Sequence, residues 1–285
     1  MGGKNAKPQW RTGQVASGDG TNISFLSAGD GPGLVVIPGN NRRAHHYEAM
    51  TGHLSREFTV HVIDRRGRGA SGPQGSDYSV EREVDDAIAV IEQTRSERVF
   101  GHSYGGLVAL RLGLRHRVAA LAVYEPAVSI RGSFDGSWVP TFTRLLNDGK
   151  PLAAMTTFMK HSRLVPIGNA PVIVFRGLAF MLLHGSDGAE TRAMMHTTPA
   201  ELQESIRSDS DGAHYSQLSS PTLLLGGSRS PSYLTEVLPQ LADIIPNARH
   251  EIIDGLDHNA PDLNAPGVVA ERITTFLADT VPAGE

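Results

Sequence analysis

Short runs of apolar residues alternate along the chain with stretches in which apolar side chains recur every three or four positions. Runs such as 34–37 and 222–225 are typical of strands buried on both faces of a parallel sheet. The stretch 80–91 follows the other pattern, with apolar residues at 80, 84, 87, 88 and 91 on one side of a helix. This alternation predicts an α/β fold, with a mostly parallel central sheet and helices on both of its faces.

The same reading assigns the remaining elements of the sheet layer. We expect strands at 13–17, 22–28, 34–37, 58–63, 98–102, 118–124, 222–225 and 250–253. We expect helices at 80–91, 104–112 and 233–245, and a last helix with Val269, Ile273, Phe276 and Leu277 on one side.

The regular alternation stops between residues 127 and 219, where no strand pattern is evident. Helix-like segments separated by turns that carry Gly and Pro occupy this region at 142–146, 152–159, 172–183 and 200–206. We interpret the region as a helical cap inserted over the carboxyl ends of the strands. The expected division is therefore a core in two parts, 1–126 and 220–285, with a cap at 127–219.

Composition narrows the function classes. The chain has 285 residues, 40% of them hydrophobic, which is enough for a large core. Its net charge of −4 argues against a nucleic acid or an anionic membrane as partner. Since there is no cysteine, disulfides, thiolate catalysis and cysteine-ligated metals are excluded. Without a secretory signal at the N-terminus or a run of about 20 apolar residues, we expect a soluble, cytoplasmic protein.

The strand at 98–102 leads directly into Gly101-His102-Ser103-Tyr104-Gly105 and then into a helix. A nucleophilic serine must stand clear of the sheet on a sharp turn, and small residues two positions on either side allow that close approach. Ser103 is therefore the candidate nucleophile. The His102 side chain, next to it in sequence, should point away from Ser103 and have a structural role.

Five motifs in this order resemble those of the α/β-hydrolase superfamily across nearly the whole chain. They are Val36-Ile37-Pro38-Gly39-Asn40, the run Asp64-Arg65-Arg66-Gly67-Arg68-Gly69-Ala70-Ser71-Gly72, the serine motif, Pro221 to Gly227, and Gly255-Leu256-Asp257-His258. The resemblance implies the serine branch of the superfamily, because relatives such as haloalkane dehalogenases and epoxide hydrolases use a carboxylate nucleophile. It also places the catalytic base at His258, which precedes the last helix. The arginines after Asp64 suggest phosphate binding, but in this setting we interpret them as stabilising the turn.

The acid of the triad requires a choice. Most relatives carry an aspartate after the seventh strand, but Ser230 occupies that position here and supplies no charge. Some branches of the superfamily carry the acid at the end of the sixth strand, where this chain has Glu125. We therefore assign Glu125, with Asp254 and Asp257 as alternatives.

The oxyanion hole needs two backbone N–H groups, which the resemblance assigns to Tyr104 and Asn40. No pair of histidines has convincing spacing with a carboxylate for a metal, and no Rossmann or P-loop motif is present. We therefore expect no metal and no cofactor.

Apolar and methionine side chains in the cap suit a cavity for irregular hydrophobic ligands. The expected substrate-binding residues are Asn41, Trp138, Phe142, Met155, Phe158, Met159 and Met181. We expect the partner to be a small molecule, a moderately hydrophobic ester or lactone hydrolysed through an acyl-enzyme. The alternatives are a non-hydrolytic catalyst such as a cyclase or isomerase, a ligand-binding protein, or a serine enzyme for acyl transfer, thioester cleavage or carbon–carbon bond hydrolysis. The sequence does not indicate the oligomeric state.

Overall fold

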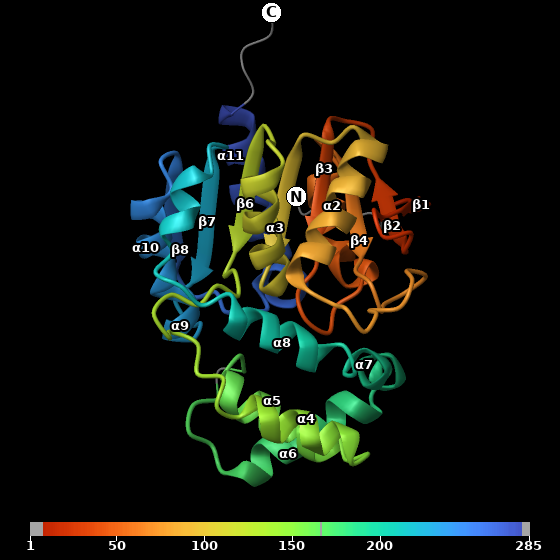
Figure 1. The fold of residues 1–285 in the computed structure, drawn as a ribbon, viewed down its shortest axis with the longest axis vertical. Helices are drawn as coiled ribbons and strands as arrows, with labels where there is room; N and C mark the ends of the chain where they lie inside the picture. Colours follow the sequence, from red (N-terminus) through yellow and green to blue (C-terminus); the bar gives the residue numbers. More distant parts are fainter. Residues whose placement is uncertain (1–7, 166, 281–285) are drawn as a thin grey trace, which may run out of the picture.

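A central sheet of eight strands organises the computed structural model, which describes residues 8–165 and 167–280 (Figure 1). The strand order is β1-β2-β4-β3-β5-β6-β7-β8. β1 and β2 pair antiparallel to each other, β2 pairs antiparallel with β4, and every later pairing is parallel. The predicted fold class is therefore confirmed.

The strands of the sheet are β1 Arg11–Ala16, β2 Asn22–Ala28, β3 Gly33–Ile37, β4 Thr59–Asp64, β5 Arg98–His102, β6 Ala120–Tyr124, β7 Thr222–Gly227 and β8 Ala248–Ile253. The helices beside the sheet are η1 Ala44–Tyr47, α1 Glu48–Leu54, α2 Val80–Thr94, α3 Tyr104–Arg115, η2 Ala213–Gln217, α9 Ser232–Thr235, α10 Val237–Ile244, η3 Ala260–Asn264 and α11 Pro266–Asp279. The single helix predicted at 233–245 is thus two helices, α9 and α10. The sequence patterns did not reveal α1, which is only seven residues long.

Two apolar layers hold the sheet between its helices. Alternate side chains of the central strands, such as Val35 and Leu34, enter opposite layers. One layer packs against α2, α3 and α10, and the other packs against α1 and α11. Since both faces are covered, the central strands are apolar throughout, which explains their continuous apolar runs.

Between β6 and η2 the described part of the chain forms five α-helices that lie at the carboxyl ends of the strands (Figure 1). They are α4 Val139–Asn147, α5 Pro151–Ser162, α6 Val172–His184, α7 Gly188–Met194 and α8 Thr198–Arg207. α8 runs directly beneath the strand ends, whereas α4, α5 and α6 form an outer layer around an apolar cluster that Leu202 of α8 also joins. The division of the chain into domains at residues 127 and 219 stays a prediction.

Candidate active site

Ser103 lies at the sharp turn between β5 and α3. Its backbone angles, φ 56° and ψ −121°, are strained for a residue with a side chain. A Cβ on Gly101 would lie 2.3 Å from the carbonyl oxygen of Gly105, and one on Gly105 would lie 2.1 Å from that of Ile37. Only glycine fits at these two positions, so the turn needs the spacing that the sequence shows.

His258 lies in the loop after β8, at the carboxyl ends of the strands, and its ring reaches Ser103 from there. Its Nε2 lies 3.0 Å from Ser103 Oγ, and its Nδ1 lies 2.6 Å from Glu125 Oε2. Because a carboxylate only accepts, Nδ1 carries the proton and Nε2 is free to accept from the serine hydroxyl. The serine, the histidine and the glutamate thus form a continuous hydrogen-bonded relay.

Glu125 is fully buried at the end of β6, with φ 45°. Its own N–H donates to the Leu225 carbonyl at 2.8 Å, which joins this position to β7. Its second carboxylate oxygen, Oε1, accepts from the N–H of Gly227 at 2.7 Å. Both oxygens are therefore held, and the carboxylate is aimed at the ring of His258.

The alternative acids make other contacts. Asp254 accepts from the Ser228 hydroxyl, and Asp257 accepts from the backbone N–H and side chain of Asn259 and Asn264, respectively. Ser230, in the usual acid position, is partly buried, and its hydroxyl has no hydrogen-bond partner among the described residues. Of the three candidates, only Glu125 reaches the imidazole.

His102 points away from Ser103, as expected, and supports the loop of the base. Its Nε2 lies 2.9 Å from the carbonyl oxygen of His258, and its Nδ1 lies 2.7 Å from the Tyr47 hydroxyl. Burial, followed by the nearby His258, holds the pKa of His102 well below its usual value, so the ring is neutral. A neutral ring donates from Nε2 and accepts at Nδ1, which fits both contacts. The role of Tyr47 had no sequence signal.

The two expected oxyanion donors flank Ser103. Tyr104 is the first residue of α3, so its N–H has no acceptor within the helix. A Cβ on Gly39 would lie 3.0 Å from Ser103 Cβ, which places the Gly39–Asn40 peptide beside the nucleophile. The carbonyl of Gly39 accepts from Arg65 and Arg68 at 3.1 Å each. Because N–H and C=O point in opposite directions in a trans peptide, these bonds turn the Asn40 N–H away from the arginines.

The same two arginines belong to a buried ion network that ties the core to the cap. Arg65 also binds Glu83, and both Arg65 and Arg68 bind Glu201 of α8. Burial alone would raise the pKa of Glu201, but the two guanidinium groups outweigh it and lower the pKa. The arginines after Asp64 are therefore committed to ion pairs within the fold, in line with the structural interpretation.

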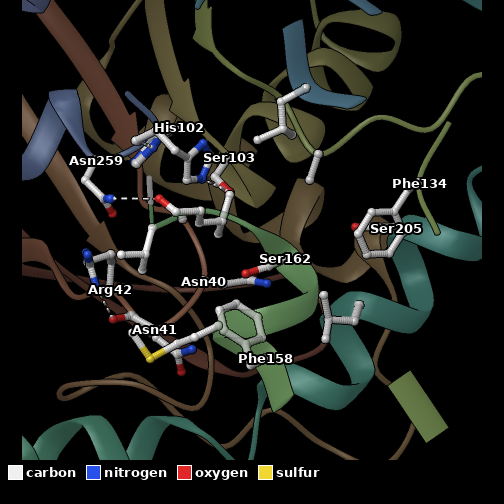
Figure 2. Close-up of a pocket in the computed structure, with 18 of the residues that line it drawn as sticks. Asn40, Asn41, Arg42, His102, Ser103, Phe134, Phe158, Ser162, Ser205 and Asn259 are labelled. Atoms are coloured by element: carbon white, nitrogen blue, oxygen red, sulfur yellow. Dashed lines mark hydrogen bonds between the residues drawn. The ribbon is translucent and has the colours of Figure 1, made fainter. Parts of the chain in front are cut away.

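A cavity of about 160 Å³ opens above Ser103 (Figure 2). Figure 2 shows Asn41, Arg42 and Asn259 on one side of it and Phe134 and Ser205 on the other. Apolar cap residues also line the cavity, among them Trp138, Met155, Phe158, Met159, Leu164, Val165, Leu182 and Leu202.

Two expected lining residues lie elsewhere. Phe142 is buried inside the cap, where it packs against Trp138 and Phe158. Met181 is 62% exposed on the outer side of α6, and its neighbour Leu182 faces the cavity instead. Both predictions are wrong for the same reason, because apolar composition does not show which side of a cap helix faces inward. The other expected lining residues do line the cavity, namely Asn41, Trp138, Met155, Phe158 and Met159, and so does Asn40, the expected oxyanion donor.

Sequence reasoning missed the polar contributors Arg42, Ser162 and Tyr233. Arg42 directly follows Asn40 and Asn41, which were both expected at the site, so its position in the sequence could have identified it as a site residue. Its Nε binds Asp262, while its side chain keeps 24% exposure. Ser162 is buried with its hydroxyl unpaired, and nothing in its local sequence marks it.

Within residues 8–165 and 167–280, one group of potential metal ligands lies together: His45, His46 and Glu190. His46 Nδ1 lies 2.9 Å from the backbone N–H of Arg43, whose guanidinium binds Glu190 at 2.6 Å. Two of the three ligands are therefore already engaged.

Comparison with known proteins shows the family of the chain. A profile of the alpha/beta hydrolase family matches residues 34–272. The sequence is 32% identical over 113 residues to the uncharacterized hydrolase YraK of Bacillus subtilis, covering 38% of this chain and 42% of that protein. It is 22% identical to 2-(acetamidomethylene)succinate hydrolase of Mesorhizobium japonicum, covering 90% of this chain and 91% of that enzyme.

Solved structures show the same fold over most of the chain. An alpha/beta hydrolase from Sphaerobacter thermophilus superposes with a TM-score of 0.78 and 29% identity, covering 93% of this chain and all of that one. An esterase from Exiguobacterium antarcticum superposes with a TM-score of 0.70 at 18% identity, covering 93% and 98% of the two chains. The second likeness is one of fold alone.

Proposed function

Since the chain belongs to the alpha/beta hydrolase family, we propose that it is a serine hydrolase that cleaves a moderately hydrophobic small-molecule ester or lactone. The observation that carries this proposal is the relay from Ser103 Oγ to His258 Nε2 at 3.0 Å and from His258 Nδ1 to Glu125 at 2.6 Å. A ligand-binding protein or an isomerase has no need of a serine activated in this way.

In the proposed reaction, Ser103 Oγ attacks the substrate carbonyl carbon while His258 Nε2 takes the hydroxyl proton. Glu125 stabilises the imidazolium that forms. His258 then gives the proton to the leaving alkoxide as the carbon–oxygen bond breaks, which leaves an acyl group on Ser103. A water molecule, deprotonated by His258, attacks the acyl carbon, releases the acid and restores the serine.

Developing charge on the substrate oxygen would be stabilised by the N–H groups of Asn40 and Tyr104. The bonds from Arg65 and Arg68 to the Gly39 carbonyl support this role, because they orient the Asn40 peptide before substrate arrives. A pre-oriented donor is worth about 3–4 kcal/mol of transition-state stabilisation.

The substrate class rests on the lining of the cavity. Trp138, Met155, Phe158 and Met159 supply an apolar, adaptable wall close to the nucleophile. Because the cavity is small, about 160 Å³, we infer short acyl groups or small lactone rings. The esterase among the structural relatives is compatible with this substrate class.

A Ser103→Ala variant tests the assignment. We expect turnover of short-chain p-nitrophenyl esters and covalent labelling by a fluorophosphonate both to disappear, with the unfolding transition unchanged. Retention of either signal in the variant rules out Ser103 as the nucleophile.

A Glu125→Gln variant tests the acid. The amide can still bind the imidazole but carries no charge, so we expect kcat to fall by about 10⁴-fold with little change in KM. The matched control is Asp257→Asn, which touches the same loop without contacting the His258 ring. Equal losses in both variants would mean that Glu125 only supports the loop.

Arg42 favours a second candidate, hydrolysis of a substrate that bears a carboxylate. Its guanidinium lines the cavity; among the described residues, its Nε binds Asp262 and its Nη1 donates to the Asn41 carbonyl. The relative from Mesorhizobium is named for a succinate derivative. Arg42→Met should then raise KM for a half-ester of a dicarboxylic acid at least tenfold more than KM for its neutral methyl diester. Equal changes for the two substrates exclude this candidate.

A further inference from the structure

Helix α6, Val172–His184, is apolar on nearly all sides, although only one side is covered. Phe175, Ala179 and Leu183 face the cap interior and are buried. The opposite side carries Ile173 and Met181, which are 68% and 62% exposed. Val172, Val174, Phe180 and Leu182 are also more than 40% exposed. A helix that is apolar all round normally lies inside a protein or against lipid.

Basic side chains lie beside this apolar surface. The stretch 139–184 contains Arg144, Lys150, Lys160, Arg163 and Arg176 and a single acid, Asp148, so its net charge is +4. With −4 for the whole chain, the remainder carries −8. In the part of the chain that the structure describes, the exposed Lys160, Arg163 and Arg176 have no carboxylate partner. Lys160 and Arg163 line the same surface hollow as Val172 at the start of α6, together with one acid, Asp135.

The position of α6 suits contact with an extended surface. With α4 and α5 it forms the part of the molecule farthest from the sheet (Figure 1). Its C-terminal end reaches the cavity, because Leu182 is 43% exposed and also lines the space above Ser103. The apolar surface is thus continuous with the candidate active site. Over the described residues no single helix is long and apolar enough to cross a membrane; α6 and α7 reach that length only as a pair bent by 103°.

We propose that the outer side of α6 and its flanking cations dock on an anionic phospholipid surface. The helix lies in the interface with Ile173 and Met181 among the acyl chains, and Lys160, Arg163 and Arg176 contact the headgroups. A second copy of the chain is a poorer occupant, because twofold packing of α6 on itself would bring the two sets of cations together. The overall charge of −4, which argued against an anionic membrane, conceals this local excess.

Vesicle co-sedimentation of the full chain tests the proposal. We expect the protein to bind vesicles of phosphatidylcholine containing phosphatidylglycerol, and to bind pure phosphatidylcholine vesicles at least tenfold more weakly. Raising the salt from 0.05 to 0.5 M should release it, since screening shortens the reach of the cations to about 4 Å.

Two sets of variants separate the contributions. Ile173→Ser/Met181→Ser should weaken binding to the anionic vesicles at least tenfold, while the matched control Ile252→Ser/Val268→Ser binds like the wild type. Ile252 and Val268 are exposed to 41% and 38% but belong to β8 and α11, away from the cap. Neutralising Lys160, Arg163 and Arg176 to Gln should weaken binding roughly fivefold per charge at low salt.

The proposal is overturned if the wild type does not bind, if it binds neutral vesicles equally, or if the Ile173/Met181 variant binds fully. It is also overturned if ultracentrifugation shows a dimer that this variant dissociates, because α6 is then a contact between copies. Ser103→Ala should bind vesicles like the wild type. A failure of the docking proposal is therefore distinguishable from a failure of the proposed serine hydrolase function.

Discussion

The cap meets its surroundings in two very different ways. On its inner side, α8 places Glu201 between Arg65 and Arg68, and all three side chains are nearly inaccessible to water. On its outer side, α6 presents Ile173 and Met181 to solvent, and no residue of the described chain covers them. The inner seam is held by charges in the protein interior, whereas the outer layer leaves apolar surface uncovered.

This difference separates α8, which must stay in place, from the outer side of α6, which is free to contact another molecule or a surface. Buried ion pairs need well-defined geometry, so they fix α8 and, through Arg65 and Arg68, the peptide before Asn40. Apolar contacts in the outer layer are adaptable and less directional. The cap therefore combines a rigid support for the Gly39–Asn40 peptide with an adaptable apolar wall around the cavity.

The seam should be the most sensitive point of the cap. Glu201→Ala leaves Arg65 and Arg68 buried with fewer counter-charges, so the free energy of unfolding should fall by about 3–5 kcal/mol. In the outer layer, the ion pair between Asp148 and Lys150 is exposed on both sides. Asp148→Ala should therefore change stability by less than about 1 kcal/mol. Urea unfolding of both variants measures the two changes in the free energy of unfolding. Similar losses for Glu201→Ala and Asp148→Ala would contradict the contrast between the inner seam and the outer layer.

The seam should also control catalysis through Gly39. Arg68→Met removes one of the two donors to the Gly39 carbonyl, so the Asn40 N–H loses its fixed direction. We expect kcat for a p-nitrophenyl ester to fall by about 10²-fold, in the range for a lost oxyanion donor, with little change in KM.

Arg66→Met provides the matched control. Arg66 is equally buried and bound to Asp86 and Asp19, but it does not contact Gly39. This variant should lose stability and keep its kcat. If both variants lose kcat alike, Arg68 acts only by supporting the fold.

The sequence allowed good prediction where constraints are local or repeated. The strand, turn and helix around Ser103 depend on Gly101 and Gly105, which lie two residues away on either side. The assignment of Glu125 followed from the missing charge at Ser230 and from the resemblance to branches of the superfamily that carry the acid at the end of the sixth strand. The structure brings Ser103, His258 and Glu125 together as predicted.

What could not be predicted depends on contacts between residues far apart in the chain. Arg68 and Glu201 are 133 positions apart, and neither shows its partner in its local sequence. Tyr47 supports the site through His102 from a 3-10 turn that has no helical periodicity. Phe142 and Met181 were placed in the cavity because they are apolar, but the side of a helix that a residue occupies is decided by tertiary packing.

Acid should weaken the second contact between cap and core, where α7 meets the loop before α1. Burial, then the neighbouring His45 and Arg42, lowers the pKa of His46 to about 4, with Glu190 and Asp262 opposing. In the unfolded chain His46 therefore takes up a proton near pH 6.5, whereas in the folded chain it does so only near pH 4. Stability should fall as pH drops through this window, by up to about 1 kcal/mol per unit after allowance for partial exposure.

A His46→Asn variant isolates this contribution. The asparagine oxygen can still accept from the Arg43 N–H, as His46 Nδ1 does at 2.9 Å, but it does not titrate. Urea unfolding at pH 7.5 and 5 should show a smaller loss in the variant than in the wild type. Identical losses would mean that other groups account for the acid sensitivity.

The smallest effect should come from the outer side of α6, and one helix offers a matched pair of phenylalanines. Phe175 is 3% exposed within the cap cluster, and Phe180 is 51% exposed on the far side. Phe175→Ala opens a cavity and should cost about 3–5 kcal/mol, whereas Phe180→Ala loses mainly its stacking on His184 and should cost about 0.5 kcal/mol. Urea unfolding of the two variants without lipid measures the difference. A large loss for Phe180→Ala would show that this side of α6 is needed for folding, and the contrast between the inner seam and the outer layer would then fail.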